Sequence, residues 1–298
     1  MTTRQLYDHL SDIFRSSGFE SPRFEAAELL NACLGLTRQQ LLTRPETTVD
    51  VTDCRTVLSM ADQRCARVPL AYLAGTTIFC GLDFAVHPGV LIPRADSEVL
   101  VETALNELTQ YRMDNGLPAD HSLRLLDLFT GSGCVGISLA HTWRQQGGSC
   151  QLDLVDIDAV ACACASDNLA RHGMQRTGRM IQADLLPPAQ PEPYDLITAN
   201  PPYIATDQIQ TLMPEVRLHE PKLALDGGPD GLYFYRRLIS RAPDYLRAGG
   251  WLLFEHGYDQ SDQVLQLFQS DTRWQHLISC RDYGGRARVT GAQLGKQA

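Results

Sequence analysis

The sequence predicts an α/β protein, with a doubly wound, mostly parallel sheet domain that follows a small all-helical domain and a β-hairpin. Over residues 1–72, apolar residues recur at helical spacing. Residues 76–86 are β-branched and aromatic around a glycine turn, which is typical of a hairpin. From residue 123 onward, short apolar runs alternate with helical stretches, as in a sheet covered by helices on both faces. We therefore expect a helical domain at 1–72, a hairpin linker at 73–95 and a sheet domain at 96–298.

Four helices are expected in the first domain. The first carries one apolar stripe from Leu6 to Phe14 and ends at Gly18. The second begins at Ser21 and Pro22, a cap followed by a first-turn proline, and ends at Gly35. A short third helix holds residues 41–42, and a fourth covers about 52–67. The domain shows no constellation of titratable residues, so we expect it to dock a partner rather than to perform chemistry.

The second domain begins with a helix over 97–111. Apolar runs then alternate with helical stretches at 124–129, 135–144, 151–156, 159–172, 180–183, 194–199, 232–246, 251–255 and 261–269. In a parallel sheet the carboxyl ends of the strands share one edge, and ligands bind in the crevice outside that edge. The residues that follow the strands are therefore the candidates for a site.

Composition excludes several classes. With 298 residues, 44% hydrophobic and 20% charged, the chain is neither disordered nor a coiled-coil rod. The net charge is −9 and only two basic residues are lysines, Lys222 and Lys296, without a basic cluster. We therefore expect no direct binding of nucleic acid. The first residues lack an apolar leader segment and no stretch could span a bilayer, so we expect no membrane association and a cytoplasmic location.

Nine cysteines are present without a Cys-x-x-Cys pair. This pattern argues against a zinc site or a disulfide framework and favours reduced thiols. No His-x-x-x-His spacing occurs either, so no metal is expected. The histidines, including His219 and His256, are expected to be structural.

A glycine-rich turn follows the first strand of the second domain. Leu128 leads into Phe129, Thr130, Gly131, Ser132 and Gly133, and a helix begins directly afterwards. Glycines let a backbone approach a ligand, and the helix N-terminus offers free N–H groups. A plain strand-to-helix turn would look the same, so this signal alone is weak.

An acid at the end of the second strand strengthens the interpretation of this turn as a ligand site. Asp156 lies 23 positions after Gly133, close to the place where an acid binds ribose hydroxyls in nucleotide-binding folds. The turn lacks the full Gly-x-Gly-x-x-Gly spacing for a pyrophosphate, which favours a nucleoside such as S-adenosylmethionine over NAD. Asp158 is expected to cap the next helix. Asp184, after the third strand, either accepts from an adenine amino group or caps a turn.

The most specific motif is Asn200, Pro201, Pro202 and Tyr203, directly after the strand at 194–199. Two successive prolines form a rigid segment that offers carbonyl acceptors without competing N–H donors. Asn200 adds a side-chain carbonyl and Tyr203 an aromatic face. The group that fits such a segment is a planar NH₂, whose two hydrogens need two fixed acceptors.

These motifs resemble S-adenosylmethionine-dependent methyltransferases of amide or exocyclic nitrogen. The resemblance extends along nearly the whole chain to the protein-(glutamine-N5) methyltransferase family that modifies peptide chain release factors. It is carried further by the segments 67–72, 91–94, 220–221, 224–225, 254–257 and 282–284, together with Phe84 and Glu98. It implies a Rossmann-like methyltransferase domain behind a helical substrate-docking domain, and S-adenosylmethionine as cofactor.

The resemblance also implies roles for residues. Phe129 to Gly133, Asp156, Leu185 and Asn200 would line the cofactor, and the segment from Asn200 to Tyr203 would hold the substrate glutamine. The substrate would be the glutamine of the Gly-Gly-Gln loop in class I peptide chain release factors, and the enzyme is expected to be a monomer.

The chain departs from that family at several positions. Phe129 stands where a small residue is frequent, Leu185 replaces a frequent aromatic residue, and Ala95 and Ser97 alter the usual Pro-Arg-Pro-x-Thr-Glu. Residues 130–134 look more like the paralogue that methylates a large-subunit ribosomal protein, whereas residues 91–98 fit the release-factor enzyme.

Three alternatives therefore stay open: a ribosomal-protein glutamine methyltransferase, a DNA adenine-N6 methyltransferase, and a binding module without activity. The acidic net charge argues against DNA, and the intact Asn200–Tyr203 motif argues against a module that has lost its activity.

The expected chemistry needs no strong base. An amide nitrogen is a poor nucleophile because its lone pair is shared with the carbonyl. If Asn200 Oδ1 and the Pro201 carbonyl accept its two N–H bonds, they stabilise the positive charge that develops as the methyl group arrives. Tyr203 is expected to pack on the amide plane.

Overall fold

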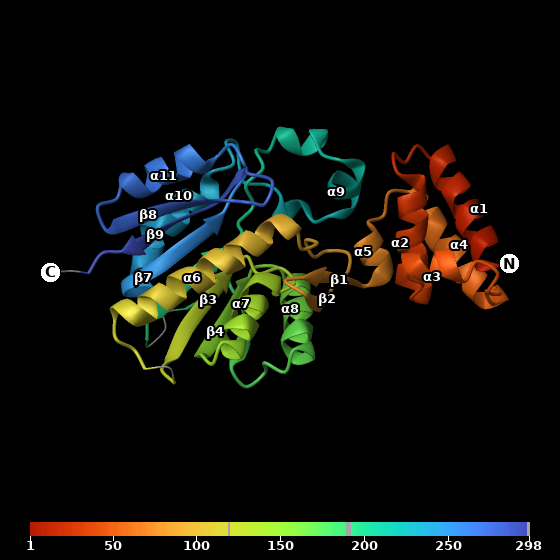
Figure 1. Cartoon of the computed structure of the whole chain (residues 1–298). Helices are drawn as coiled ribbons and strands as arrows, with labels where there is room; N and C mark the ends of the chain where they lie inside the picture. Colours follow the sequence, from red (N-terminus) through yellow and green to blue (C-terminus); the bar gives the residue numbers. More distant parts are fainter. Residues whose placement is uncertain (119, 189–191, 297–298) are drawn as a thin grey trace. The chain divides into compact units, whose positions relative to one another are not determined.

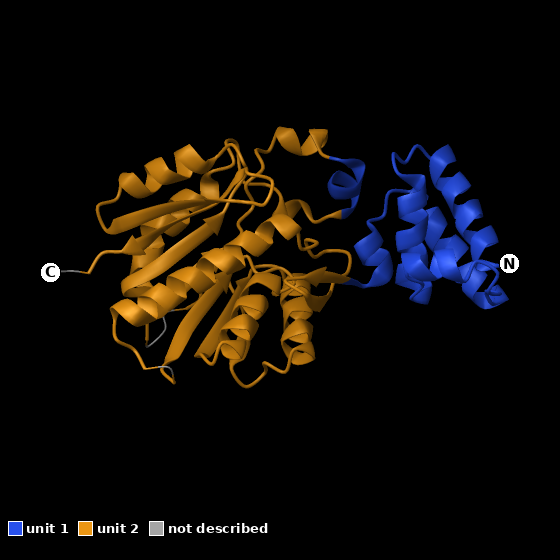
Figure 2. Ribbon diagram, viewed as in Figure 1, with its two compact units in different colours: residues 1–76, 213–219 blue, residues 77–212, 220–298 orange. Residues whose placement is uncertain are grey.

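The computed structural model describes residues 1–118, 120–188 and 192–296. By their internal contacts these residues form two compact units (Figure 2). Unit 1 comprises Met1–Thr76 and Met213–His219, and unit 2 comprises Thr77–Leu212 and Glu220–Ala298. The division differs from the expected one at two places: the residues after Thr76 belong to unit 2 rather than to a separate linker, and the segment 213–219 belongs to the helical unit.

Unit 1 is helical (Figure 1). Its helices are α1 (Thr3–Ser16), α2 (Pro22–Leu34), α3 (Arg38–Thr43), α4 (Val51–Cys65), α5 (Leu70–Ala74) and α9 (Pro214–His219). The predicted stripe is inside, because Leu6, Leu10 and Phe14 are fully buried against residues of α2 and α4. Phe24 of the second helix is exposed instead, and the Arg38 guanidinium lies 4.5 Å from its ring centre. Ser21 precedes α2 but makes no side-chain cap.

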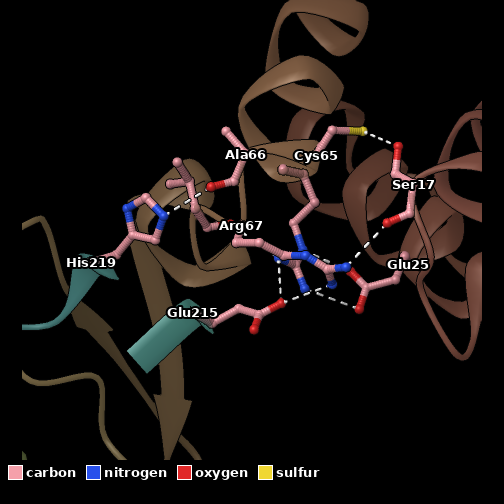
Figure 3. A network of polar contacts seen from close by, with 9 residues as sticks. Ser17, Glu25, Cys65, Ala66, Arg67, Glu215 and His219 are labelled. Atoms are coloured by element: carbon pink, nitrogen blue, oxygen red, sulfur yellow. Dashed lines mark hydrogen bonds and ion pairs between the residues drawn. The ribbon is translucent and has the colours of Figure 1, made fainter. Parts of the chain in front are cut away.

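Helix α9 joins unit 1 through charged groups (Figure 3), although the chain places it between two strands of unit 2, β6 (Tyr194–Ala199) and β7 (Leu246–Glu255). Arg64 contacts Glu25 at 2.9 Å and Glu215 at 3.2 Å, and Arg67 contacts Glu215 at 3.4 Å. His219 Nε2 lies 3.0 Å from the carbonyl oxygen of Ala66. The side chains of Arg64 and Glu215 are 8% and 16% exposed, so this is a largely buried ionic cluster.

The hairpin packs on unit 2. Its strands are β1 (Thr76–Phe79) and β2 (Leu82–Ala85). The amide of Ala85 donates to Asn168 Oδ1 at 2.8 Å, and the Phe84 ring lies 4.9 Å from that of His172. Phe79 and Phe84 are both buried in the core of this unit. The predicted hairpin is therefore present as part of the sheet domain.

A seven-stranded sheet forms the centre of unit 2, with the order β5-β4-β3-β6-β7-β9-β8. The strands are β3 (Ser122–Leu128), β4 (Ser149–Asp156), β5 (Gly178–Gln182), β6 (Tyr194–Ala199), β7 (Leu246–Glu255), β8 (Trp274–Arg281) and β9 (Ala287–Leu294). Strands β3 to β7 run parallel, and β9 is antiparallel to both β7 and β8. The parallel part was predicted, but the antiparallel pair β8–β9 was not.

Helices cover both faces of the sheet (Figure 1). One face carries α6 (Glu98–Asp114), α7 (Cys134–Gln145) and α8 (Ala159–Arg171), and the other carries α10 (Tyr233–Arg241) and α11 (Ser261–Gln269). Successive residues of β3 alternate between the two cores, with Leu125 in the first and Leu126 in the second. The predicted helix 232–246 stops earlier, at Arg241, because Pro243 follows and the chain continues as a short 3₁₀ turn, η4 (Ala242–Asp244).

The order of the strands fixes where a ligand can bind. The chain starts at β3, moves outward through β4 to β5, and then returns to the other side of β3 with β6. Ligands bind at such a reversal, outside the carboxyl ends of the strands. Among the described residues, no helix is long and apolar enough to cross a membrane.

Candidate active site

A cavity of about 250 Å³ lies at the carboxyl ends of β3, β4 and β6, entirely within unit 2. Its wall contains most of the residues that the sequence singles out: Phe129, Thr130, Gly131, Ser132, Asp156, Asp184, Leu185, Asn200 and Pro202. Gly133, Pro201 and Tyr203 do not line it. The structure thus brings the four separate motifs to one place.

Asp127, the penultimate residue of β3, organises the glycine-rich turn. Its buried carboxylate accepts hydrogen bonds from the Thr130 hydroxyl at 2.5 Å, the Thr198 hydroxyl at 2.7 Å and the Gly136 amide at 3.2 Å. Burial raises the pKa of Asp127 to about 6, although these donors act in the opposite direction. The sequence analysis assigned no role to this residue, which ties the turn to the neighbouring strand β6.

Gly133 is required by the local geometry. It is the N-cap of α7 with φ +82°, and a Cβ atom there would lie 2.8 Å from Ile137 Cδ1. A side chain would therefore be both strained and in collision with the helix it begins. Gly133 shapes the turn from beside the cavity, and Gly131 contributes its backbone to the wall.

Asp156 ends β4, and its carboxylate is held by backbone donors. Oδ2 accepts from the Gly131 amide at 2.9 Å, and Oδ1 accepts from the Asp158 amide at 3.0 Å. Burial raises its pKa above the ordinary value. Asp158 caps α8 as predicted, because its side chain accepts from the Val160 amide at 2.7 Å. Asp156 thus stands fixed on the cavity wall as a charged acceptor.

Two of the departures from the family pattern, Phe129 and Leu185, share one backbone feature. Their φ angles are +55° and +70°, in the region that favours glycine. The Phe129 ring packs edge-to-face on Phe234 at 5.0 Å, and Leu185 is buried. Glycine at position 129 would make this turn with less strain, and the ring contact offsets part of the cost in this chain.

Asp184 has a partner that the sequence did not suggest. Its Oδ2 lies 3.3 Å from Arg237 of α10, and its side chain is largely exposed. Asp184 also lines the cavity. Its role, as an acceptor for an adenine amino group or as a turn cap, stays a prediction.

The Asn200–Tyr203 segment follows β6 and is held from several sides. Asn200 Nδ2 donates to the Ser97 hydroxyl at 3.3 Å, and in the described chain no protein group donates to Asn200 Oδ1. Gln260 Nε2 donates to the carbonyl of Tyr203 at 2.9 Å. A Cβ at Gly231 would lie 2.4 Å from that same carbonyl, so the loop 227–231 packs directly on the motif. The side chain of Tyr203 turns away from the cavity, with its hydroxyl 3.5 Å from Glu255 Oε1.

Two further segments of the wall had no role in the sequence analysis. Residues 89–94 lie on one side of the cavity and residues 221–224 on another. The buried carboxylate of Glu220 joins them, because it pairs with the Arg94 guanidinium and accepts from the Ile92 amide at 3.3 Å. Both segments belong to the family resemblance, but an arginine and a glutamate 126 positions apart carry no linear signal of their pairing.

The histidines and cysteines near the site are structural. His256 is buried, its ring nitrogens lie 2.8 Å from the Gly257 carbonyl and from the Thr290 hydroxyl, and burial lowers its pKa. Burial raises the pKa of the Cys134 thiol, which keeps it protonated. Within the described residues, no group of three His, Cys, Asp or Glu side chains could hold a metal ion.

Comparison with known proteins identifies this arrangement. Residues 5–75 match the family model described as "PrmC N-terminal domain", and residues 106–228 match "Methyltransferase small domain". The chain is 39% identical to the release factor glutamine methyltransferase of Geobacter sulfurreducens, over 99% of this chain and 97% of that protein. It is 38% identical to the protein of that name from Moorella thermoacetica, over 97% of each. The chain belongs to the release factor glutamine methyltransferase family.

A solved structure supports the fold of this family member. The hMettl16 catalytic domain in complex with an MAT2A 3′UTR hairpin superposes with a TM-score of 0.54, over 84% of this chain and 83% of that chain. Sequence identity is 14%, so this likeness concerns the fold alone.

The family and its fold imply S-adenosylmethionine as the cofactor, and the residues of the wall fit it. Asp156 offers a carboxylate for the ribose hydroxyls. The Ser132 hydroxyl is 2% exposed, lines the cavity and has no hydrogen-bond partner in the described chain, so a polar ligand atom would satisfy it. Apolar side chains such as Phe129 and Leu185 offer contacts to a flat base.

Proposed function

We propose that this enzyme transfers a methyl group from S-adenosylmethionine to the N5 amide nitrogen of the glutamine in the Gly-Gly-Gln loop of class I peptide chain release factors. The observation that carries the proposal is Asn200, whose carboxamide lies on the cavity wall with Nδ2 bonded to Ser97. Its Oδ1 is therefore the atom available to an incoming N–H donor.

The chain's own residues bind and orient the amide. Asn200 Oδ1 accepts one of the two N–H bonds. The Pro201 carbonyl is the proposed second acceptor, because its carbon is bonded to the nitrogen of Pro202, which lies on the wall. Neither proline has an N–H group that could compete for these acceptors. When bound, S-adenosylmethionine supplies the methyl group on a sulfonium.

The two acceptors matter most while the bond forms. As the amide nitrogen becomes positively charged, acceptors fixed beside its hydrogens stabilise that charge without reorganising. After methylation the nitrogen loses one proton to solvent water, and the primary amide has become a neutral secondary amide. Tyr203 supports the segment through its backbone rather than lining the cavity, so we assign it to positioning.

A glycine-flanked glutamine suits the site sterically. The cavity is walled by Pro202 and by the segments 89–94 and 221–224. Only an exposed loop with small neighbours can extend one side chain into such a space, whereas glutamines inside helices or strands cannot. The names of the relatives support a release factor as the partner.

The decisive experiment offers labelled S-adenosylmethionine with an intact release factor, a large-subunit ribosomal protein or duplex DNA. We expect label only in the release factor, at the Gly-Gly-Gln glutamine. Changing that glutamine to glutamate should abolish methylation, because both N–H donors are lost and a negative charge faces the acceptors. Asparagine should be a poor substrate because its nitrogen falls one methylene short. Label in the ribosomal protein or in DNA alone would refute the proposal.

We further propose that unit 1 docks the release factor. Its surface carries exposed apolar side chains, including Phe24 at 51% and Leu42 at 81% exposure. If these side chains dock the substrate, F24A and L42A should raise the KM for an intact release factor and leave the KM for a short Gly-Gly-Gln peptide unchanged. Equal effects on both substrates would assign unit 1 to folding alone.

The location and assembly of the enzyme are proposals as well. None of the nine cysteines forms a disulfide, which suits a reducing compartment such as the cytoplasm. We also propose that the enzyme is a monomer. Sedimentation of the purified protein would test it.

A further inference from the structure

The inference concerns Glu255, the last residue of β7. Its side chain is 2% exposed and does not line the cavity. The backbone carbonyl accepts from the Tyr235 hydroxyl at 2.9 Å, so the residue is anchored in the sheet. Neither the proposed cofactor site nor the amide site uses its carboxyl group.

That carboxyl group is incompletely satisfied. The Tyr203 hydroxyl reaches Oε1 at 3.5 Å, and Oε2 has no hydrogen-bond partner in the described chain. The Ser97 hydroxyl and the Asn200 amide are both close enough to lower its pKa as hydrogen-bond donors. A buried carboxylate oxygen without a partner is costly, which points to a role.

Asn200 needs such a partner for a specific reason. Rotation of its carboxamide by half a turn would place Nδ2 instead of Oδ1 toward the substrate, and a donor would then face a donor. The Ser97 hydroxyl alone cannot prevent this, because a hydroxyl both donates and accepts. A carboxylate only accepts. When Ser97 donates its proton to Glu255, its lone pairs are left for Asn200 Nδ2, and Oδ1 faces the cavity.

We propose that Glu255 is a positioning residue for methyl transfer: its ionised carboxylate, acting through Ser97, fixes the Asn200 carboxamide with its oxygen toward the substrate amide. The inference rests on the proposed function of Asn200. Hydrogen bonds that serve catalysis are often long in a free enzyme and tighten when substrate binds, which agrees with the open Oε2.

The charges around Glu255 make the effect depend on pH. Groups that face it from the packed elements are Asp96, Cys134, Tyr203, Tyr235 and Arg288. Burial raises the pKa of Glu255 to about 7, against the effects of Ser97, Arg288 and Asn200. Below this pH the protonated acid can itself donate to Ser97 and reverse the chain of hydrogen bonds. The kcat should therefore rise with pH through about 7.

The test compares Glu255→Gln with the wild type on a Gly-Gly-Gln peptide. Glutamine has nearly the same shape, but it can donate as well as accept, so it no longer fixes the direction. We expect kcat to fall about tenfold or more with little change in the KM for S-adenosylmethionine, and the rise near pH 7 to disappear. Ser97→Ala, which removes the link between the two residues, should produce the same loss of kcat and of pH dependence.

Two controls separate positioning from folding. Glu102→Gln makes the same chemical change at an exposed residue that the Tyr283 hydroxyl contacts, and it should leave kcat and its pH profile unchanged. The melting temperature of Glu255→Gln should be equal to or above that of the wild type, because a buried charge is removed. The inference is overturned if Glu255→Gln keeps a kcat near that of the wild type. It is also overturned if the rise of kcat near pH 7 survives in both Glu255→Gln and Ser97→Ala. A wild type that does not methylate the peptide refutes the proposed function instead.

Discussion

Arg64 of α4 and Glu215 of α9 lie 151 positions apart in the chain, and their side chains meet at 3.2 Å in the helical unit. A six-residue helix such as α9 has little stability of its own. Its place in unit 1 therefore depends on this ionic cluster and on the contact between His219 and Ala66. Within unit 1, residues 213–219 are thus tied to the N-terminal helices by charge.

The first prediction concerns Glu215→Gln. The change leaves Arg64 with Glu25 but removes the charge shared with Arg67, so we expect a loss of about 1–2 kcal/mol in the free energy of unfolding. Hydrogen exchange of residues 213–219 should accelerate. The matched control is Glu46→Gln, because Glu46 pairs with Arg4 at 4.0 Å on the surface and should contribute less than about 0.5 kcal/mol. Equal effects of the two changes would contradict the prediction.

The same pair predicts a pH dependence. Burial acts to raise the pKa of Glu215, but hydrogen bonds and the charges of Arg64 and Arg67 outweigh it, and the pKa lies below its ordinary value of 4.5. A lowered pKa in the folded state means that the pair stabilises the protein above pH 4.5 and that this stabilisation is lost as the pH falls below it. We would measure the melting temperatures of the wild type and Glu215→Gln between about pH 3 and pH 7. The two temperatures should converge at the acidic end of this range.

The cluster also shows where prediction from the sequence stops. Helical periodicity located α1, α2 and α4 because an apolar stripe is a local signal. The assignment of α9 to the helical unit depends on pairs between residues far apart, and a single sequence does not contain that information. Deletion of residues 1–72 is therefore a poor test of docking, because it removes Arg64 and Arg67 and leaves Glu215 without these partners.

The residues of the candidate site also fall into those that a local sequence signal predicts and those that it does not. Asp156 and Asn200 were predictable because Asp156 ends one apolar strand and Asn200 directly follows another, and the carboxyl ends of parallel strands meet. Asp127, Ser97 and Glu255 were not assigned roles. Asp127 and Ser97 line the cavity, but all three contact other side chains of the chain, and no sequence motif marks such contacts. Strands β8 and β9 were missed since their alternating polar residues give a weaker signal than a buried parallel strand.

The second prediction concerns the strained turn at Phe129, with φ +55°. Both F129A and F129G lose the contact with Phe234, but only glycine relieves the backbone. The glycine variant should be more stable than the alanine variant by about 1 kcal/mol in chemical unfolding. The control is the pair F84A and F84G in strand β2, where φ is not positive and glycine should be the less stable of the two. The same order of stability at both positions would show that the turn is not strained.

The third prediction concerns Asp156. Asp156→Ala removes a charged acceptor from the wall, so S-adenosylmethionine binding should weaken by about 1.5–3 kcal/mol in calorimetry. Because burial raises the pKa of this carboxyl group, affinity in the wild type should start to fall at a higher pH than for an exposed aspartate. Asp262→Asn is the control, because Asp262 is exposed in the first turn of α11 and does not line the cavity, so the affinity should change little. Unchanged affinity in Asp156→Ala would refute the assignment of β4 to the ribose.

The fourth prediction concerns Asn200, and it is the opposite of the third in its kinetic signature. Asn200→Ala removes an acceptor that is needed mainly as charge develops on the substrate nitrogen, so kcat should fall by about 10²-fold or more. The affinity for S-adenosylmethionine should fall less than in Asp156→Ala, because Asp156 is the residue predicted to bind the cofactor. Single-turnover methylation of a Gly-Gly-Gln peptide, with calorimetry on the same preparations, measures both quantities. Turnover within a few-fold of the wild type would show that the amide is held by other groups. A loss confined to cofactor affinity would move Asn200 from the transfer step to the cofactor site.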